Sequence, residues 1–366
     1  MRREPELRRA WLARSLAIAA AGAMGAAGAA RAACAGWLGL HQVGARENAG
    51  AGTGSRMRAE TREAIKRGLA YLARVQNNDG TFAGGSMSRN VAVCSLAGLA
   101  LLSSGSVPGR GPYSSVLKRA LAFVLDCAQP SGFIHLPAAA SHGPMYEHGF
   151  AALFLAEVYG MSDRSDLRER LEIAIKLIVD KQNQEGGWRY QPERRDADLS
   201  VTICQIMALR AARNAGLHVP AETIDRCVEY VKRCQNPDGG FNYMLSMPGQ
   251  SRFPRSAAGV VALQSAGIYD SEEIRNGLNY LRQHLPGKTR GEGDEYFFYG
   301  QYYAVQAMWH AGETDWNEWY AAIQDQLLPR QRPDGQWFDA ISSAYGTAMA
   351  CLILQTPISA LPIFQR

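Results

Sequence analysis

The sequence predicts an all-α protein, an α6–α6 toroid in which about six helix–turn–helix repeats form an inner and an outer ring of helices. Two observations favour this fold. A short motif containing glutamine and glycine returns at a fixed spacing, and each copy separates an amphipathic segment from a segment that is apolar on nearly all sides. In addition, the alternating polar and apolar pattern of a β-strand is not found over a useful length.

The repeated motif reads Gln-x-x-Asp/Glu-Gly-x-Trp/Phe. Its four full copies begin at glutamines 76, 182, 235 and 331, and a shorter copy begins at glutamine 129. The glutamines at 76, 129, 182 and 235 are each 53 residues apart. The longer interval before 331 predicts one degraded copy in between, and the segment Gln283-His284-Leu285-Pro286-Gly287 has this place. A fixed period predicts one structural unit per copy.

Each copy has the same order of elements. An amphipathic segment such as 172–181 or 226–234 precedes the glutamine, and the Asp-Gly turn ends it. An apolar segment follows; the clearest are 91–102, 150–159, 201–212 and 257–266. A helix that is apolar on all sides is buried, so these segments are expected to form the inner ring. The glutamine is expected to hydrogen bond backbone groups at the next helix end, and the aromatic residue to stack on its amide.

The N-terminal segment has the features of an export signal. Arg8-Arg9-Ala10-Trp11-Leu12 precedes a weakly apolar run, and Ala30-Arg31-Ala32 offers a small-x-small cleavage site. The paired arginines resemble a twin-arginine signal. A membrane anchor is disfavoured because the run is short and rich in Ala and Gly. We therefore expect residues 1–32 to be an export signal, 33–57 a flexible Gly/Ala linker and 58–366 the toroid, with the mature protein periplasmic or extracellular.

Charge and cysteine content exclude several classes of protein. The net charge is +5, but residues 1–32 hold six arginines and only two glutamates, so the remainder is nearly neutral. A nearly neutral body predicts no nucleic-acid partner and no strong membrane signal in the mature chain. The seven cysteines are irregularly spaced and mostly lie in apolar segments, which favours buried thiols over a disulfide framework.

The motif series resembles the repeat of squalene–hopene cyclases and of the β subunits of protein prenyltransferases. The resemblance covers roughly residues 58–366 and implies an α6–α6 barrel with the substrate in a central cavity. Full-length squalene–hopene cyclases have two helical barrels, whereas this chain has room for one. The segment Gly187-Trp188-Arg189-Tyr190, followed by Asp198-Leu199-Ser200-Val201-Thr202, is similar to a single-barrel bacterial branch of this superfamily.

One segment matches the acid motif of the cyclases in part. Triterpene and class II diterpene cyclases carry Asp-x-Asp-Asp-Thr, and here Asp196 and Asp198 match its first two aspartates. The resemblance implies that Asp198 protonates an alkene or epoxide with Asp196 as its partner. Leu199 replaces the last aspartate and Ser200 the threonine. It therefore stays open whether Asp198 only caps the inner helix by accepting from the N–H of Ser200 or Val201.

The zinc site of the protein prenyltransferases is not expected. That family binds zinc with Asp-x-Cys on one inner helix and a histidine on another, but Ser200 stands in place of the cysteine and Gly346 in place of the histidine. Because a catalytic zinc needs three good protein ligands, the sequence predicts no metal, and it indicates no other cofactor.

The turns that lead into the inner helices are expected to gather at one mouth of the ring. Aromatic and polar residues at these turns are therefore candidates for lining the cavity, and aromatic faces stabilise carbocations. Helical spacing is expected to place Tyr296, Tyr299 and Tyr303 on one face. The candidate lining residues are Tyr146, Glu147, His148, Tyr190, Arg255, Tyr296, Tyr299, Tyr303, Trp337 and Tyr345.

The predicted function is an isoprenoid cyclase that acts on a hydrophobic small molecule by acid-initiated carbocation chemistry. Two alternatives stay open: an exported toroid that binds a lipid, glycan or peptide without chemistry, and a toroid polysaccharide lyase or hydrolase that uses Glu147, Asp198 or Asp294. A dry aromatic pocket with Asp198 facing inward would favour the cyclase, whereas an open groove with paired carboxylates would favour the lyase or hydrolase.

Overall fold

The computed structural model describes residues 57–82, 87–288 and 296–364. The expected export signal, residues 1–32, lies outside this part of the chain, as do Asp294 and the expected linker apart from Met57. Within the described residues the chain forms twelve α-helices and no β-strand, which confirms the all-α prediction. None of these helices is both long and apolar enough to cross a membrane.

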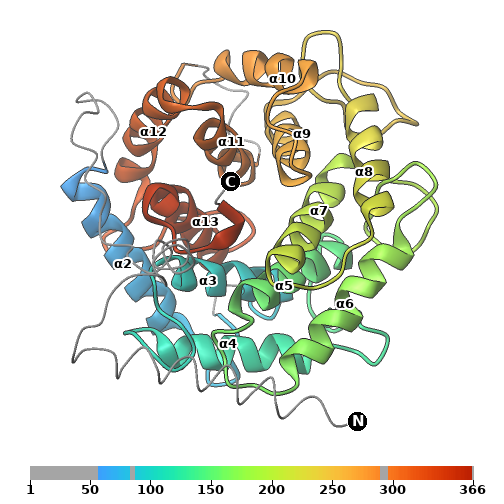
Figure 1. The fold of residues 1–366 in the computed structure, drawn as a ribbon. Helices are drawn as coiled ribbons and strands as arrows, with labels where there is room; N and C mark the ends of the chain where they lie inside the picture. Colours follow the sequence, from blue (N-terminus) through green and yellow to red (C-terminus); the bar gives the residue numbers. More distant parts are fainter. Residues whose placement is uncertain (1–56, 83–86, 289–295, 365–366) are drawn as a thin grey trace, which may run out of the picture. The chain divides into compact units, whose positions relative to one another are not determined.

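The helices alternate along the chain between an outer and an inner position (Figure 1). The outer helices are α2 (Ala59–Val75), α4 (Ser114–Asp126), α6 (Leu167–Lys181), α8 (Ala221–Arg233), α10 (Glu272–Arg282) and α12 (Glu313–Leu327). The inner helices are α3 (Val91–Ser103), α5 (Pro144–Val158), α7 (Leu199–Asn214), α9 (Phe253–Ser265), α11 (Phe297–Ala311) and α13 (Ser343–Gln355). Every residue of α3 is buried, as its uniformly apolar sequence predicts.

The inner helices form a closed ring. Each packs against the next in order, and α13 packs against α3, so the last inner helix meets the first. The outer helix α2 also packs against α13. Helical repeats bury their apolar faces only against neighbouring repeats, so the two terminal repeats need either a cap or ring closure. Here the packing of α13 against α3 provides the closure. The toroid prediction is therefore confirmed.

The motif glutamines connect consecutive repeats through their side-chain amides. Gln182 Nε2 donates to Gly186 O in its own turn and to Thr223 O near the start of α8, both at 2.8 Å. The other full copies make the same two bonds: Gln76 to Gly80 O and Val116 O, Gln235 to Gly239 O and Glu273 O, and Gln331 to Gly335 O and Ala64 O. The bond from Gln331 reaches α2 and closes the outer ring. The expected hydrogen bonds from the glutamines to the next repeat are thus confirmed.

The glycine of the motif turn has two reasons to be glycine. Gly186 has a φ of +102°, a conformation that strains residues with a side chain. A Cβ atom there would also lie 2.1 Å from Arg226 O of α8. Gly80 stands in the same relation to Arg119 O of α4, at 2.2 Å. The turn therefore allows the backbones of consecutive outer helices to approach closely.

The motif tryptophans connect the outer and inner rings. Trp188 donates its Nε1–H to Ile178 O of α6 at 2.7 Å and its backbone N–H to Thr202 Oγ1 of α7 at 3.1 Å. Trp337 makes the matching bonds to Leu327 O and Thr347 Oγ1, at 2.8 and 3.0 Å. Hydrogen bonds to both helices fix these rings in place; the sequence did not indicate this arrangement.

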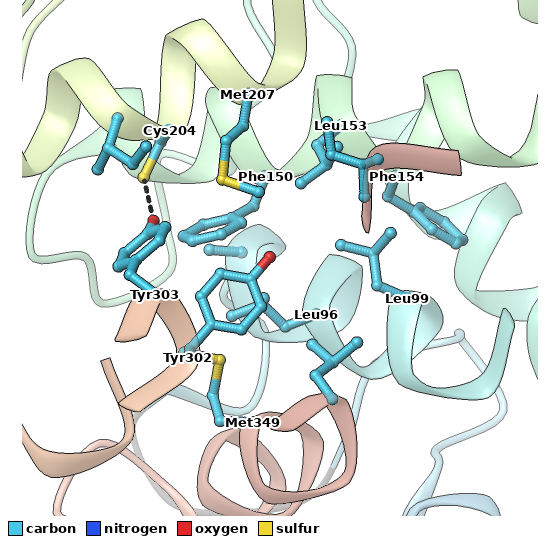
Figure 2. Packing of buried hydrophobic residues seen from close by; sticks show 14 of the residues in the cluster. Leu96, Leu99, Phe150, Leu153, Phe154, Cys204, Met207, Tyr302, Tyr303 and Met349 are labelled. Atoms are coloured by element: carbon cyan, nitrogen blue, oxygen red, sulfur yellow. Dashed lines mark hydrogen bonds between the residues drawn. The ribbon is translucent and has the colours of Figure 1, made fainter. Parts of the chain in front are cut away.

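Apolar side chains from several inner helices meet inside the inner ring (Figure 2). Phe150 of α5, Met207 of α7 and Met349 of α13 lie around Tyr302 and Tyr303 of α11, and all five are buried. At this level the protein's own side chains occupy the interior. A polar site is therefore expected nearer the ends of the inner helices, where polar and titratable side chains are found.

Candidate active site

Asp198 lies immediately before α7 and caps it. Its backbone is extended, with φ −129° and ψ 154°, and its carboxyl Oδ1 accepts from the Val201 N–H at 2.9 Å. The Ser200 hydroxyl donates to the same oxygen at 2.6 Å. The expected capping role is therefore confirmed, and the two donors define Oδ1 as the acceptor oxygen of this carboxyl group.

The same carboxyl group has features of an acid. Asp198 is 0% exposed, and its Oδ2 is buried without a hydrogen-bond partner. Burial raises the pKa of the Asp198 carboxyl above its ordinary value; the hydrogen bonds from Ser200 and Val201 and the charge of Arg189 act in the opposite direction. A proton on this group is best held by Oδ2, because Oδ1 already accepts two hydrogen bonds.

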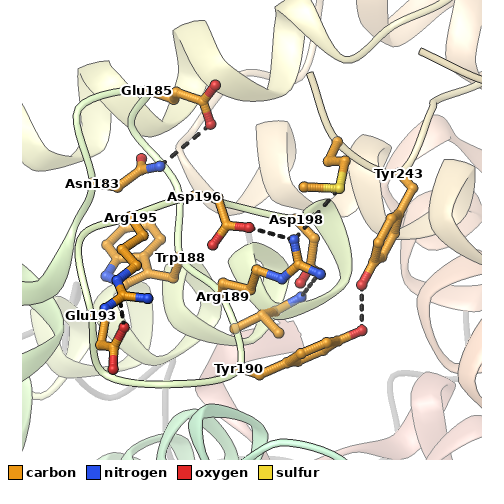
Figure 3. Close-up of polar contacts among 12 residues, drawn as sticks. Asn183, Glu185, Trp188, Arg189, Tyr190, Glu193, Arg195, Asp196, Asp198 and Tyr243 are labelled. Carbon is orange, nitrogen blue, oxygen red and sulfur yellow. Dashed lines mark hydrogen bonds and ion pairs between the residues drawn. The ribbon is translucent and has the colours of Figure 1, made fainter. Parts of the chain in front are cut away.

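Asp196 pairs with Arg189 and not, as was expected, with Asp198. Its side chain is 48% exposed and forms an ion pair with Arg189, whose Nη1 lies 2.6 Å from Asp196 Oδ2 (Figure 3). The guanidinium lies over the Tyr190 ring, 5.2 Å from its centroid. Asp196 was expected to be a direct partner of Asp198; instead it fixes the position of a cation whose charge acts on Asp198.

Ser200 connects Asp198 to tyrosines of two other inner helices. The Tyr146 hydroxyl of α5 lies 2.6 Å from Ser200 Oγ, and the Tyr299 hydroxyl of α11 donates to Ser200 O at 3.4 Å. We call Tyr146, Asp198, Ser200 and Tyr299 the Ser200 cluster. Three inner helices therefore contribute to one hydrogen-bonded group at the N-terminus of α7.

The Ser200 cluster is partly accessible. Ser200, Tyr146 and Tyr299 each keep some exposed surface. Burial nevertheless raises the pKa of the Tyr146 and Tyr299 phenols well above the usual value. Side chains that are reached by water yet surrounded by protein are expected on the wall of a recess rather than on a convex surface. The cluster thus joins a buried carboxyl group to accessible aromatic rings.

Two further contacts extend the aromatic part of the site. Tyr299 and Tyr303 meet edge to face with ring centroids 4.9 Å apart, and the Tyr303 hydroxyl contacts Cys204 Sγ of α7 at 3.6 Å. The Tyr190 hydroxyl hydrogen bonds that of Tyr243. Tyr243 was not predicted, although it follows the fourth motif as Tyr190 follows the third, and this periodicity could have identified it.

Glu147 and His148 have structural partners. Glu147 Oε2 accepts from the Val91 N–H at the start of α3 at 3.3 Å. His148 Nδ1 accepts from the Ile134 N–H, and its Nε2–H donates to Ala174 O of α6, both at 3.1 Å. In the second repeat His148 therefore accepts a hydrogen bond from a backbone N–H after the motif, as Thr202 does in the third repeat. Full burial lowers the pKa of His148 to about 4, so the ring is neutral at physiological pH.

The remaining predicted lining residues are distributed over several places. Arg255 donates Nε–H to Phe241 O at 3.0 Å and holds the loop before α9. Trp337 is buried between helices, while Tyr345 lies in the first turn of α13. Tyr296 is 64% exposed and precedes α11 with a left-handed φ of 59°. The expectation that Tyr296 shares a helix face with Tyr299 and Tyr303 is therefore wrong.

Among the residues that the structure describes, no three His, Cys, Asp or Glu side chains gather in a way that would hold a metal ion.

A hollow of about 280 Å³ lies between α6 and the segment before α8. It contains none of the predicted site residues; its lining is Glu172, Ile175, Lys176, Val179, Leu217, His218 and Pro220.

Comparison with known families identifies the repeat. The model of the squalene-hopene cyclase C-terminal domain matches residues 152–302, and that of the prenyltransferase alpha-alpha toroid domain matches residues 53–172. The chain belongs to the terpene cyclase/prenyltransferase α/α-toroid superfamily. A drimenyl diphosphate synthase of Streptantibioticus cattleyicolor is 28% identical over 207 residues, which are 52% of this chain and only 34% of that synthase.

Solved structures of low sequence identity share the toroid fold. A variant of the type II terpene cyclase MstE from Scytonema, in complex with geranylgeranyl dihydroxybenzoate, has a TM-score of 0.58 at 16% identity, over 82% of this chain and 98% of that one. The cellobiose 2-epimerase from Spirochaeta thermophila has a TM-score of 0.61 at 13% identity, with the same coverage. Because terpene and carbohydrate enzymes match equally well, the fold by itself does not decide the chemistry.

Proposed function

We propose that this superfamily member is an isoprenoid cyclase that starts carbocation chemistry by protonating an alkene or epoxide from Asp198. The observation that carries the proposal is the state of the Asp198 carboxyl group. It is fully buried, its pKa is raised by that burial, and one of its oxygens has no partner. A carboxylic acid must be held neutral before it can protonate carbon, and this environment favours the neutral form.

The environment also favours loss of the proton once a substrate accepts it. The proton leaves from Oδ2, and the negative charge that remains is stabilised by the Ser200 and Val201 donors to Oδ1. The positive end of the α7 dipole and the nearby charge of Arg189 act in the same direction. Tyr146 and Tyr299 of the Ser200 cluster supply aromatic rings that would stabilise the positive charge that then develops on the substrate.

The substrate class follows from the relatives rather than from the geometry. One matched relative is named for drimenyl diphosphate, and one solved neighbour holds geranylgeranyl dihydroxybenzoate. We therefore propose a linear isoprenoid with a terminal alkene. Its reacting carbon must reach Asp198 Oδ2, which a structure with a bound unreactive analogue tests directly.

Solvent deuterium tests the proposed chemistry. The purified chain is incubated in D₂O with linear isoprenoids of increasing length, with and without a diphosphate group, and the products are analysed by mass spectrometry. Acid-initiated cyclisation places one solvent deuteron on the cyclised product. Asp198→Asn removes the acid but retains a capping amide oxygen, as Asn90 shows by capping α3. Cyclisation that persists in this variant would exclude Asp198 as the acid.

Binding without chemistry is the second candidate. Leu199 in place of the last acid of the motif favours it, as does the cap that Asp198 provides for α7. A binding protein would hold the same intact isoprenoid in the wild type and in Asp198→Asn. The deuterium experiment separates the two functions, because binding alone leaves the ligand unlabelled and linear.

We further propose that residues 1–32 direct export of the folded protein. The Arg8-Arg9 pair supports a route that carries folded proteins. The six cysteines of the described residues are all buried and none forms a disulfide, as expected for a protein folded under reducing conditions. Cell fractionation of wild type beside an Arg8→Lys, Arg9→Lys double variant tests this. An equal exported fraction in both would contradict the twin-arginine route.

A further inference from the structure

The last described segment of the chain enters the ring. After α13 the chain forms the short 3₁₀ helices η4 (Thr356–Ile358) and η5 (Pro362–Phe364). We call residues 359–364 the C-terminal plug. Four of its six residues, Ser359, Leu361, Ile363 and Phe364, are buried although they belong to no α-helix.

The C-terminal plug contacts α3, α7 and α11. Ala360 N–H donates to Ser103 O at the end of α3 at 3.3 Å, and the Ser359 and Ser103 hydroxyls lie 2.9 Å apart. The Phe364 ring meets Tyr302 of α11 edge to face at 6.3 Å, and η5 packs against α7. These contacts involve few residues, and they release more easily than a full helix does.

A buried carboxyl group of α5 holds the plug. Glu157 is 3% exposed, and it accepts a hydrogen bond from the Ile363 N–H while its Oε2 has no partner. Among the described residues, the charged or titratable groups that face it are Arg210 of α7 and Tyr302 of α11. Residues 359–364 contain no titratable side chain, and neither does α3 near Ser103.

We propose that the C-terminal plug is a detachable closure of the ring and that Glu157 is its latch: the plug is seated while Glu157 is protonated and released when Glu157 ionises. The seated plug keeps water from the carboxyl group, so ionisation and release favour each other. The plug also supports Tyr302, which packs against Tyr303 with centroids 4.9 Å apart. Tyr303 contacts Tyr299 of the Ser200 cluster, so release of the plug removes support from the candidate site.

The direction of the pH dependence follows from linkage. Burial raises the pKa of Glu157 from 4.5 to about 8 in the seated state. With the plug released, the hydrated carboxyl group returns toward 4.5. The seated state therefore holds a proton that the released state has lost between pH 4.5 and 8, so the opening constant rises by up to about tenfold per pH unit in this window. Outside the window it is constant.

Hydrogen exchange on the full chain tests the latch without any substrate. Protection factors of the Ala360, Ile363 and Phe364 amides are measured from pH 5 to 9 and corrected for the intrinsic rate of exchange. We expect the wild-type protection to fall by at least tenfold up to pH 8 and then to level off, while amides of α7 remain protected. In Glu157→Gln the same amides keep a constant protection, because glutamine does not ionise.

A second variant separates the latch from packing. Phe364→Ala weakens the packing of the plug at every pH. The plug amides of this variant are therefore less protected than those of the wild type, but their protection falls with the same pH slope. Equal slopes in the wild type and in Glu157→Gln would overturn the proposal, and so would a wild type whose protection does not change with pH. Neither result bears on the proposed cyclase activity, since no turnover is measured. If Glu157→Gln fails to fold, the pH dependence of protection in the wild type, with its plateau above pH 8, decides whether the proposal holds.

Discussion

Replacement of Gln182 by leucine tests the joint between consecutive repeats. The side chain is buried, and its Nε2 donates to Gly186 O and to Thr223 O, each at 2.8 Å. Leucine has a similar size but no donor. Each lost hydrogen bond costs about 1 kcal/mol, and a buried carbonyl left without a partner costs about 1–3 kcal/mol. Thr223 O lies in α8, where a helical donor remains available, so we count the second penalty only for Gly186 O.

The expected loss of unfolding free energy is therefore about 3–5 kcal/mol, measured by urea denaturation followed by circular dichroism. Gln129→Leu is the matched control. Gln129 has the same place in the shortened second motif, but its side chain makes no hydrogen bond to the described residues, and the neighbouring carbonyl of Ala128 accepts from Arg170 instead. We expect this control to change stability by less than about 0.5 kcal/mol. Equal losses in the two variants would refute the assignment of the joint to the glutamine amide.

Substitutions at three further residues test other parts of the structure. Because the pKa of His148 is lowered to about 4, wild-type stability falls by up to about 1.4 kcal/mol per pH unit between pH 6.5 and 4, and urea titrations should show a smaller slope for His148→Gln. Thr202→Val removes the acceptor of the Trp188 N–H and should cost about 1–3 kcal/mol by the same method. Asp198→Asn should change stability by less than about 1 kcal/mol, since Asn90 caps α3 equally well, whereas Asp198→Leu loses the cap and should cost about 0.5–2 kcal/mol in thermal or urea unfolding.

The fold could be predicted because its information is local and repeated. Each Asp-Gly turn specifies one helix end, and the period of 53 residues specifies one pair of helices per copy. The degraded copy at Gln283 also proved to be a helix end, since α10 ends at Arg282. Closure by the bond from Gln331 to Ala64 joins residues from opposite ends of the domain, and no local pattern reports it.

The candidate site was predictable only where a residue contacts residues close to it in the sequence. Asp198 caps α7 through residues two and three positions later, so its place followed from the sequence. The contact of Tyr146 with Ser200 joins two helices and depends on how these pack. Tyr296 was misplaced because helical spacing was extended one turn too far, into a residue with left-handed backbone.

The most direct test of the acid role of Asp198 is mass spectrometry of the hydrophobic small molecules that copurify with the protein. Wild type is compared with Asp198→Asn, whose cap and fold we expect to be retained. We expect the wild type to carry a cyclised isoprenoid and the variant to carry its uncyclised precursor. The same ligand in both preparations, or no ligand in either, would contradict the cyclase and leave Asp198 as the cap of α7.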